Sequence, residues 1–164
     1  MTLIARSEHL LAIQSNGLRI NSQSNGSFTV PVKATDSPRE VGPLDLILYT
    51  VKTYDDESAL PIVSPLVESG TTVLSLQNGV DSWQRLQVNL PADSVLPGAI
   101  YIEASVESPG VVKQQGQVYR LVLGEADGSI TQRLQPIVGA FQDTGLPTEA
   151  SSGILNVLWS KWLF

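Results

Sequence analysis

Two polar residues of this chain each follow a short apolar run, in the position that a ligand-binding residue takes in a parallel sheet. Lys52 ends the apolar part of residues 45–54, and Asn78 follows residues 71–76. Short unbroken apolar runs of this kind indicate strands that are buried on both faces. In open α/β sheets, ligands bind beyond the carboxyl ends of the strands. We therefore expect Lys52 and Asn78 at one ligand-binding edge, where a cation and an amide can hold a carboxylate or a phosphate.

Lys161 falls on the apolar side of a helix predicted for residues 153–164. At about 100° per residue, it lies between Ile154 and Val157 on the helical wheel, whereas Asn156 and Ser160 form the polar side. Burial disfavours the charged form of a lysine and lowers its pKa, so a lysine there can donate a proton near neutral pH. The alternative, which the helix alone favours, is that the aliphatic stem passes along the apolar side to water.

The other candidates also have structural alternatives. Ordinary capping of strand ends would explain Lys52 and Asn78, and Asn78-Gly79 is a turn pair that accepts positive φ. Arg6 ends a predicted first strand at residues 2–5. In a dinucleotide-binding fold, an arginine after the second strand binds the 2′-phosphate of NADP, where an acidic residue would bind the ribose of NAD. A surface arginine is the alternative.

Composition excludes several classes of site and partner. Among 164 residues there are no cysteines and one histidine, so zinc, iron–sulfur and disulfide chemistry are not expected. The net charge is −6 and no Lys/Arg cluster occurs, which argues against nucleic-acid binding. No window approaches the roughly 18 apolar residues of a membrane span, and the apolar start is too short for a signal peptide. We expect a cytoplasmic protein without metal, nucleic-acid or membrane partners.

Alternating strand and helix signals predict an α/β fold of the doubly wound kind. Ser7 is expected to cap a first helix with Leu10, Leu11 and Ile13 inward and Gly17 at its end, and Asp81 to cap a short helix. Residues 33–43 are interpreted as a connector. The remaining strands are predicted at 18–20, 28–32, 95–102, 111–113 and 118–123, and the remaining helices at 55–67 and 130–141.

Several motifs together resemble the ketopantoate reductase (2-dehydropantoate 2-reductase) family. They are Val-Lys-Thr-Tyr at 51–54, Leu-Gln-Asn-Gly-Val at 76–80 and Trp-Ser-Lys-Trp-Leu at 159–163, with Leu-Ile-Ala-Arg-Ser-Glu-His-Leu at 3–10 and Asn-Gly-Leu-Arg-Ile at 16–20. The resemblance implies an incomplete Rossmann-like doubly wound sheet over residues 1–150, without its first βα unit. Residues 151–164 would then be the first helix of a missing C-terminal helical domain.

The resemblance also implies an activity, the NADPH-dependent reduction of 2-dehydropantoate to pantoate on the route to coenzyme A. Lys161 matches the family's general acid, and Arg6 matches the residue that recognises the 2′-phosphate. Lys52, Gln77, Asn78 and Gly79 match positions that line the cofactor cleft. A small 2-oxo acid would be the substrate, and homo-oligomerisation is left open.

The sequence departs from the family pattern, and this leads us to expect differences in cofactor binding and stability. The family's G-x-G-x-x-G turn is absent from this sequence, so the usual cradle for the pyrophosphate is missing. Without the first strand, a sheet of order 3-2-1-4-5-6 has a gap in its middle. We expect this excerpt to be unstable or rearranged, and inactive by itself. A related reductase of another 2-oxo acid, or a non-catalytic interaction module, remains the alternative.

Overall fold

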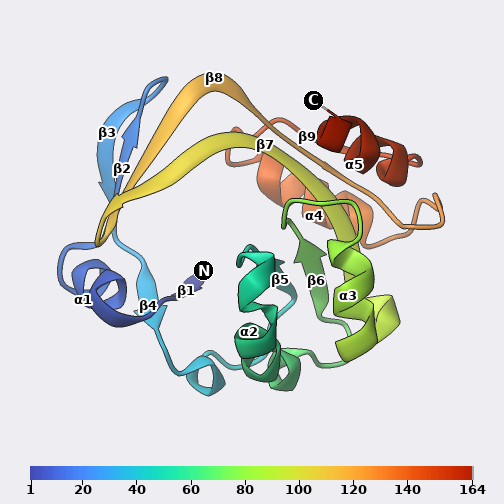
Figure 1. The fold of residues 1–164 in the computed structure, drawn as a ribbon, viewed down its shortest axis with the longest axis horizontal. Coiled ribbons are helices and arrows are strands. Elements are labelled where there is room, and N and C mark those ends of the chain that lie inside the picture. The colour runs from blue at the N-terminus through green and yellow to red at the C-terminus, as the bar shows by residue number, and fades with distance from the viewer. Residues whose placement is uncertain (164) are drawn as a thin grey trace. The chain divides into compact units, whose positions relative to one another are not determined.

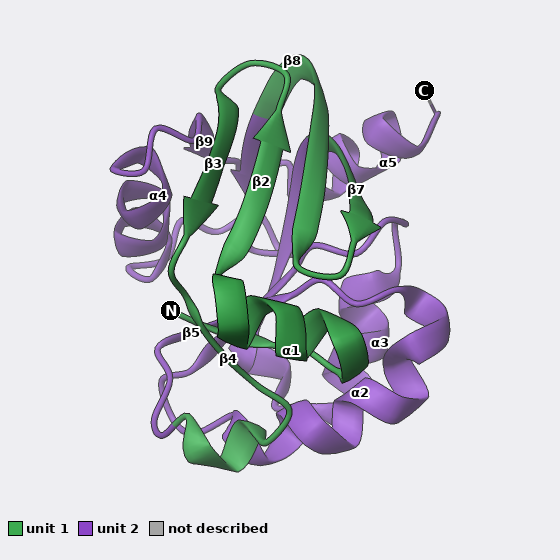
Figure 2. Ribbon diagram, turned by 90° about the vertical axis from the view of Figure 1, so that its left-hand side faces the viewer, with its two compact units in different colours: residues 1–41, 102–119 green, residues 42–101, 120–164 purple. Residues whose placement is uncertain are grey.

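The structure is a computed structural model that describes residues 1–163. These residues form two compact units, coloured green and purple in Figure 2. The first unit comprises Met1–Val41 with Ile102–Tyr119, and the second comprises Gly42–Tyr101 with the chain from Arg120 onwards. Two long strands, β7 (Val95–Ser108) and β8 (Val111–Leu123), each contribute residues to both units (Figure 1).

The second unit is built on a parallel arrangement of three strands. Strand β5 (Leu46–Tyr49) pairs with β6 (Thr72–Ser75), and β6 pairs with the start of β7. Strand β8 is the next neighbour, and it carries the short parallel strand β9 (Thr148–Ala150). The helices of this unit are α2 (Asp56–Val63), α3 (Ser82–Asn89), α4 (Leu134–Gln142) and α5 (Ile154–Leu163), with 3-10 turns at Thr53–Asp55, Ser64–Leu66 and Ala92–Ser94.

Apolar side chains bury both faces of β6, as its unbroken apolar run predicts, whereas β5 is less buried than predicted because Leu48 is 41% exposed. Val73 and Leu74 are adjacent in β6 and both fully buried, yet they belong to different core clusters. Successive side chains of a strand point to opposite faces, so each face has its own core. Helices α2, α3 and α5 contribute to the cluster around Val73, and α4 contributes to the cluster around Leu74. The α/β, doubly wound fold class is confirmed.

The first unit begins with β1 (Thr2–Ile4), α1 (Ser7–Asn16) and the antiparallel hairpin of β2 (Leu18–Ser22) and β3 (Gly26–Val30). Strand β2 also pairs in parallel with β8. Gly17 joins α1 to β2 with a φ of 75°, and an added Cβ would lie 2.7 Å from the Val30 carbonyl oxygen. Only glycine meets both demands, so Gly17 ends the helix as expected.

The described strands form two separate sheets. Strand β1 pairs in parallel with β4 (Lys33–Thr35) in a two-stranded sheet of their own. Strand β5 is the last strand on its side of the other sheet. In the order 3-2-1-4-5-6, the first strand lies between the second and the fourth. Within residues 1–163, no strand joins β1 to β5.

Helix boundaries required three corrections. Ser7 does not cap α1, because it is already the first helical residue, with a φ of 52°, and Arg6 occupies the cap position without a side-chain hydrogen bond. Asp81 precedes α3 but forms an ion pair with Arg85 in place of a cap. The helix predicted from residue 130 begins only at Leu134. Only for Asp81 does a side-chain contact, the ion pair with Arg85, replace the expected cap.

Strand boundaries and one burial prediction were also wrong. The connector at 33–43 contains β4 and a 3-10 turn at Pro38–Glu40. The three short strands predicted after residue 95 are two long ones, with Pro109-Gly110 as the turn. Leu11 is 63% exposed, so α1 buries only Leu10 and Ile13.

The predicted domain boundary at residue 150 stays a prediction. Helix α5 contributes Leu158 to the core of the second unit, and Phe164, the end of the predicted range 151–164, lies outside the described residues. Among residues 1–163, no helix is both long enough and apolar enough to cross a membrane.

Candidate functional site

The structure brings Lys161 and Asn78 into direct contact. The Nζ of Lys161, near the end of α5, donates a hydrogen bond of 2.9 Å to Oδ1 of Asn78, which follows β6. Ile154 and Leu158 of α5 are buried, and Lys161 continues the same helical face at its end. The lysine therefore lies at the rim of the core, half-buried, with its amino group at the edge of the sheet.

Burial lowers the pKa of Lys161. Its amino group has the ring of Tyr101 at 5.7 Å on one side and the Asn78 amide oxygen as hydrogen-bond acceptor. Among the described residues it forms no salt bridge. A lysine without a carboxylate partner and partly removed from water loses its proton more readily than an exposed one. These are the properties of a proton donor.

Lys52 occupies the matching position on the neighbouring strand. Tyr49 of β5 is in register with Ser75 of β6, so Lys52 and Asn78 each follow the aligned pair by three residues. Both therefore lie beyond the carboxyl edge of the parallel strands, as predicted. The Lys52 side chain is exposed, and no hydrogen bond within residues 1–163 ties it to Asn78 or Lys161. Its ammonium group is free to reach an anion.

Gln77 is turned into the protein and connects the two strand ends. It is 5% exposed, and its Nε2 donates to the Val51 carbonyl oxygen (3.0 Å) and to Oδ1 of Asp56 (2.6 Å). The same carboxylate oxygen accepts the hydroxyl of Tyr49 at 3.0 Å. Burial, followed by this hydrogen bond, raises the pKa of Tyr49. The Oε1 of Gln77 is buried without a partner among the described residues. Its visible function is to hold the loops after β5 and β6 together.

Gly79 allows the backbone to turn directly after Asn78. Its φ is 114°, a conformation that residues with a side chain rarely adopt. The turn leads into α3, whose residue Trp83 donates its indole N–H to the Val80 carbonyl oxygen at 3.1 Å. The loop that carries Asn78 is thus fixed at both ends, by Gln77 on one side and by Trp83 on the other.

Arg6 belongs to the first unit, whereas the other predicted site residues all belong to the second. It follows β1 and is exposed at the start of α1. Its side chain forms no salt bridge among the described residues. The guanidinium is therefore available to a ligand that reaches the carboxyl end of β1.

Two residues near Lys161 were missed by the sequence reasoning. Arg120 lies with its Cζ 4.4 Å from the centroid of the Tyr101 ring, the same ring that Lys161 faces. Tyr101 had been interpreted only as part of a strand. The available signal was the turn at Pro109-Gly110, because residues nearly equidistant from a hairpin turn face one another across the two strands.

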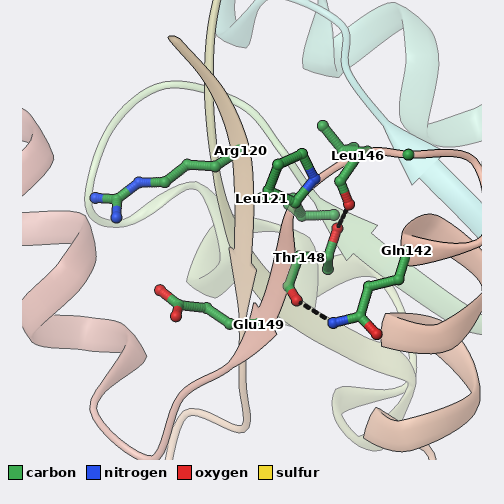
Figure 3. A pocket seen from close by; sticks show the side chains of 8 residues that line it. Arg120, Leu121, Gln142, Leu146, Thr148 and Glu149 are labelled. Carbon is green, nitrogen blue, oxygen red and sulfur yellow. Dashed lines mark hydrogen bonds between the residues drawn. The ribbon is translucent and has the colours of Figure 1, made fainter.

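A separate pocket lies beside β8 and β9, with a volume of about 380 Å³. Two hydrogen bonds lie within its wall: Gln142 Nε2 donates to the Thr148 carbonyl oxygen at 2.7 Å, and Thr148 Oγ1 to the Leu146 carbonyl oxygen at 2.9 Å (Figure 3). The pocket is lined by Arg120, Leu121, Gln142, Gly145, Leu146, Pro147, Thr148 and Glu149. Neither Lys161 nor Asn78 belongs to it.

Comparison with known proteins gives one consistent family. A family model described as ketopantoate reductase PanE/ApbA matches residues 1–128. A 2-dehydropantoate 2-reductase of Halobacterium salinarum is 34% identical over 160 residues, which are 96% of this chain and 52% of the relative. The chain spans about half the length of the curated relatives it matches.

Solved structures agree on the fold. The crystal structure of 2-dehydropantoate 2-reductase from Porphyromonas gingivalis superposes with a TM-score of 0.90 at 29% identity, over 98% of this chain and 56% of that one. A ternary structure of D-mandelate dehydrogenase with NADH and anilino(oxo)acetate has a TM-score of 0.86 at 22% identity, over 98% and 52%. At 22% identity, the second likeness concerns the fold alone.

Proposed function

Because the chain belongs to the PanE/ApbA ketopantoate reductase family, we propose that it supplies the proton donor and cofactor-side residues of an NADPH-dependent reductase. The substrate would be 2-dehydropantoate and the product pantoate. The observation that carries this proposal is the 2.9 Å hydrogen bond from Lys161 Nζ to Asn78. It joins the end of α5 to the sheet edge at which ligands of α/β folds bind.

The residues present fit part of a dinucleotide. The exposed guanidinium of Arg6 can bind a phosphate. At the carboxyl edge of the strands, Lys52 can bind an anion and Asn78 can form hydrogen bonds with an amide. The sequence has no glycine-rich turn to supply backbone N–H groups to a pyrophosphate. NADPH, when bound, would supply the hydride that reduces the carbonyl carbon.

Lys161 would act on the carbonyl oxygen. As negative charge develops there, the ammonium group donates its proton, giving the hydroxyl of the product and leaving a neutral amine. The amine then regains a proton from water. Asn78 would fix the direction of the ammonium group, because its amide oxygen accepts one N–H and leaves the others to the substrate. The lowered pKa of Lys161 makes this transfer easier near neutral pH.

A chimera tests the reaction. The chain replaces the matching 160 residues of the Halobacterium salinarum relative, and NADPH oxidation is followed with 2-dehydropantoate. We expect Lys161→Ala to lower kcat by about 10² to 10⁴, the usual contribution of a general acid, with little change in NADPH affinity. Lys113→Ala, which removes an exposed cation from β8, is the matched control. A Lys161→Ala chimera with the unaltered rate would exclude the proposed role.

The same chimera tests the cofactor. Arg6→Ala should weaken NADPH binding in calorimetry by about tenfold or more, because a charge-assisted hydrogen bond to the 2′-phosphate is lost. NADH lacks that phosphate, so its affinity should stay unchanged. Equal losses for the two cofactors would mean that Arg6 does not read the 2′-phosphate.

A further inference from the structure

The ring of Tyr101 has two cations against it. The Cζ of Arg120 is 4.4 Å from the ring centroid, and the Nζ of Lys161 is 5.7 Å from it. All three residues belong to the second unit, on β7, β8 and α5. Like charges gathered around one ring repel each other unless an anion joins them. The cluster of Tyr101, Arg120 and Lys161 therefore has the charge of an anion-binding site.

Arg120 keeps its hydrogen-bonding capacity for a ligand. Among the described residues it forms no salt bridge, and its guanidinium lies over the ring of Tyr101. A guanidinium that stacks on an aromatic face retains the N–H donors along its edge. Those donors form a planar fork that matches the two oxygens of a carboxylate. Arg120 is therefore oriented, exposed and without a competing anion in hydrogen-bond contact.

The residues of the neighbouring pocket give the Arg120 guanidinium no hydrogen bond or salt bridge. In Figure 3 the side chains of Arg120 and Glu149 point to one side of the strand, and Gln142 lies on the other. Glu149 is the acidic residue of the pocket lining, yet it forms no salt bridge with Arg120. The guanidinium instead lies at the ring that Lys161 shares.

We propose that Arg120 binds the carboxylate of the 2-oxo acid, and that Tyr101 positions it beside Lys161. This inference rests on the proposed function. In a 2-oxo acid the carboxylate carbon is bonded directly to the carbonyl carbon, so its binding group must lie close to the proton donor. Arg120 Cζ and Lys161 Nζ lie 4.4 and 5.7 Å from the centroid of the same Tyr101 ring, so the ring is the neighbour that both groups share. A phosphate of the cofactor shares the same chemistry, but it is not attached to the carbonyl that Lys161 protonates.

The test is a titration of the chimera, observed by NMR at the Arg120 Nε–H group. The probes are 2-dehydropantoate, its lactone, which keeps the carbonyl but has no free carboxylate, and inorganic phosphate. We expect 2-dehydropantoate alone to shift the signal in a saturable way. Either the lactone or phosphate acting equally well would overturn the proposal, as would the absence of any shift.

Variants separate charge, ring and fold. The dissociation constant of 2-dehydropantoate should rise about tenfold or more in Arg120→Gln, and less in Arg120→Lys, which keeps a charge but loses the fork. Tyr101→Phe keeps the ring and should bind normally, whereas Tyr101→Leu should bind weakly. Lys113→Gln removes a remote exposed cation as control. Equal binding in Arg120→Gln and the unaltered chimera would disprove the assignment.

The chimera distinguishes this inference from the proposed function. If it oxidises NADPH and Arg120→Gln raises the KM for 2-dehydropantoate with little effect on kcat, both stand. If the chimera is active and Arg120→Gln leaves the KM for 2-dehydropantoate unchanged, only the proposed carboxylate site is disproved. If the chimera is inactive but Arg120 still binds 2-dehydropantoate and not its lactone, the carboxylate site is supported and the proposed reductase reaction is disproved.

Discussion

Lys161 combines three features that rarely coincide in a surface lysine: partial burial, an amide acceptor and an aromatic neighbour. Burial lowers its pKa, so at a pH between the folded and unfolded values the folded chain binds fewer protons at this site. Stability therefore rises with pH across that window, because the cost of burying the charge disappears when the amine becomes neutral. Catalysis has the opposite dependence, since only the protonated form can donate.

We predict that kcat/KM of the chimera falls as pH rises through the Lys161 pKa, with a midpoint below the ordinary lysine value of 10.5. Titration of the Lys161 Nζ signal in the chain by NMR, assigned with Lys161→Ala, should also give a midpoint below 10.5. Tyr101→Leu should move this midpoint upward, because water would reach the amine. A midpoint at or above 10.5 in the unaltered chain would contradict the burial argument.

The sequence predicts single residues well where one element suffices to place them. The helical wheel puts Lys161 on the apolar side of its helix, although the helix alone favours an amino group that reaches water, and the ends of two apolar runs put Lys52 and Asn78 at one edge. Tyr101 and Arg120 escape notice because the pairing of two long strands brings them together. The inward turn of Gln77 is equally hidden, since no local pattern distinguishes a buried amide from one that faces a ligand.

At the scale of elements, one ion pair ties three segments together. Arg133, just before α4, donates to both oxygens of Glu125, just after β8, at 2.7 and 2.6 Å. It also donates to the carbonyl oxygens of Asp93 and Val95 at the start of β7. The hydrogen bond from Arg133 lowers the pKa of Glu125, although burial opposes the shift. The Arg133–Glu125 pair therefore holds together the start of β7, the segment that follows β8 and the start of α4.

We predict that Arg133→Met destabilises the chain by about 3 kcal/mol, because it leaves the buried Glu125 carboxylate with the Thr131 hydroxyl as its remaining side-chain donor and removes the guanidinium from two carbonyl groups. The control is Asp81→Asn, which breaks only the exposed pair with Arg85 and should cost less than about 1 kcal/mol. Urea unfolding measures both. Equal losses in the two variants would show that the Arg133–Glu125 pair does not hold these segments together.

The same pair has a defined pH dependence. Since the folded pKa of Glu125 is lowered, its contribution is complete above the ordinary glutamate pKa and is lost as pH falls through the folded value. Arg133→Met should lack this part of the acid destabilisation. Unfolding curves of both proteins at a series of acidic pH values would then converge.

Elements with strong local patterns were predicted, and those that depend on distant partners were not. The parallel strands β5 and β6 are apolar runs, and α4 has regular helical spacing. Strand β4 has only three residues and exists because β1 pairs with it. The outer half of β7 is largely exposed, including Val106 at 64%, so burial gives no periodic signal there.

At the scale of the whole molecule, the separate sheets determine what this chain can do alone. Strands β1 and β5 belong to different sheets, and each leaves one row of backbone N–H and C=O groups without a strand partner among residues 1–163. Such groups cost free energy when they are buried without partners and attract other strands when they are exposed. An additional strand would satisfy the row on which it pairs, as the first strand does for its neighbours in the order 3-2-1-4-5-6.

We predict that joining a strand, a G-x-G-x-x-G turn and a helix before Met1 raises the melting temperature and creates NADPH binding in calorimetry. The strand would pair with an edge that the described strands leave open, and the turn would supply N–H groups to the pyrophosphate. The matched control carries the same segment with its glycines changed to alanine. It should keep the gain in stability and lose the binding, because alanine blocks the close approach of the backbone to phosphate. NADPH binding by the unaltered chain would mean that the glycine-rich turn is not needed, and an added segment that leaves melting unchanged would mean that the open edges do not take up a further strand.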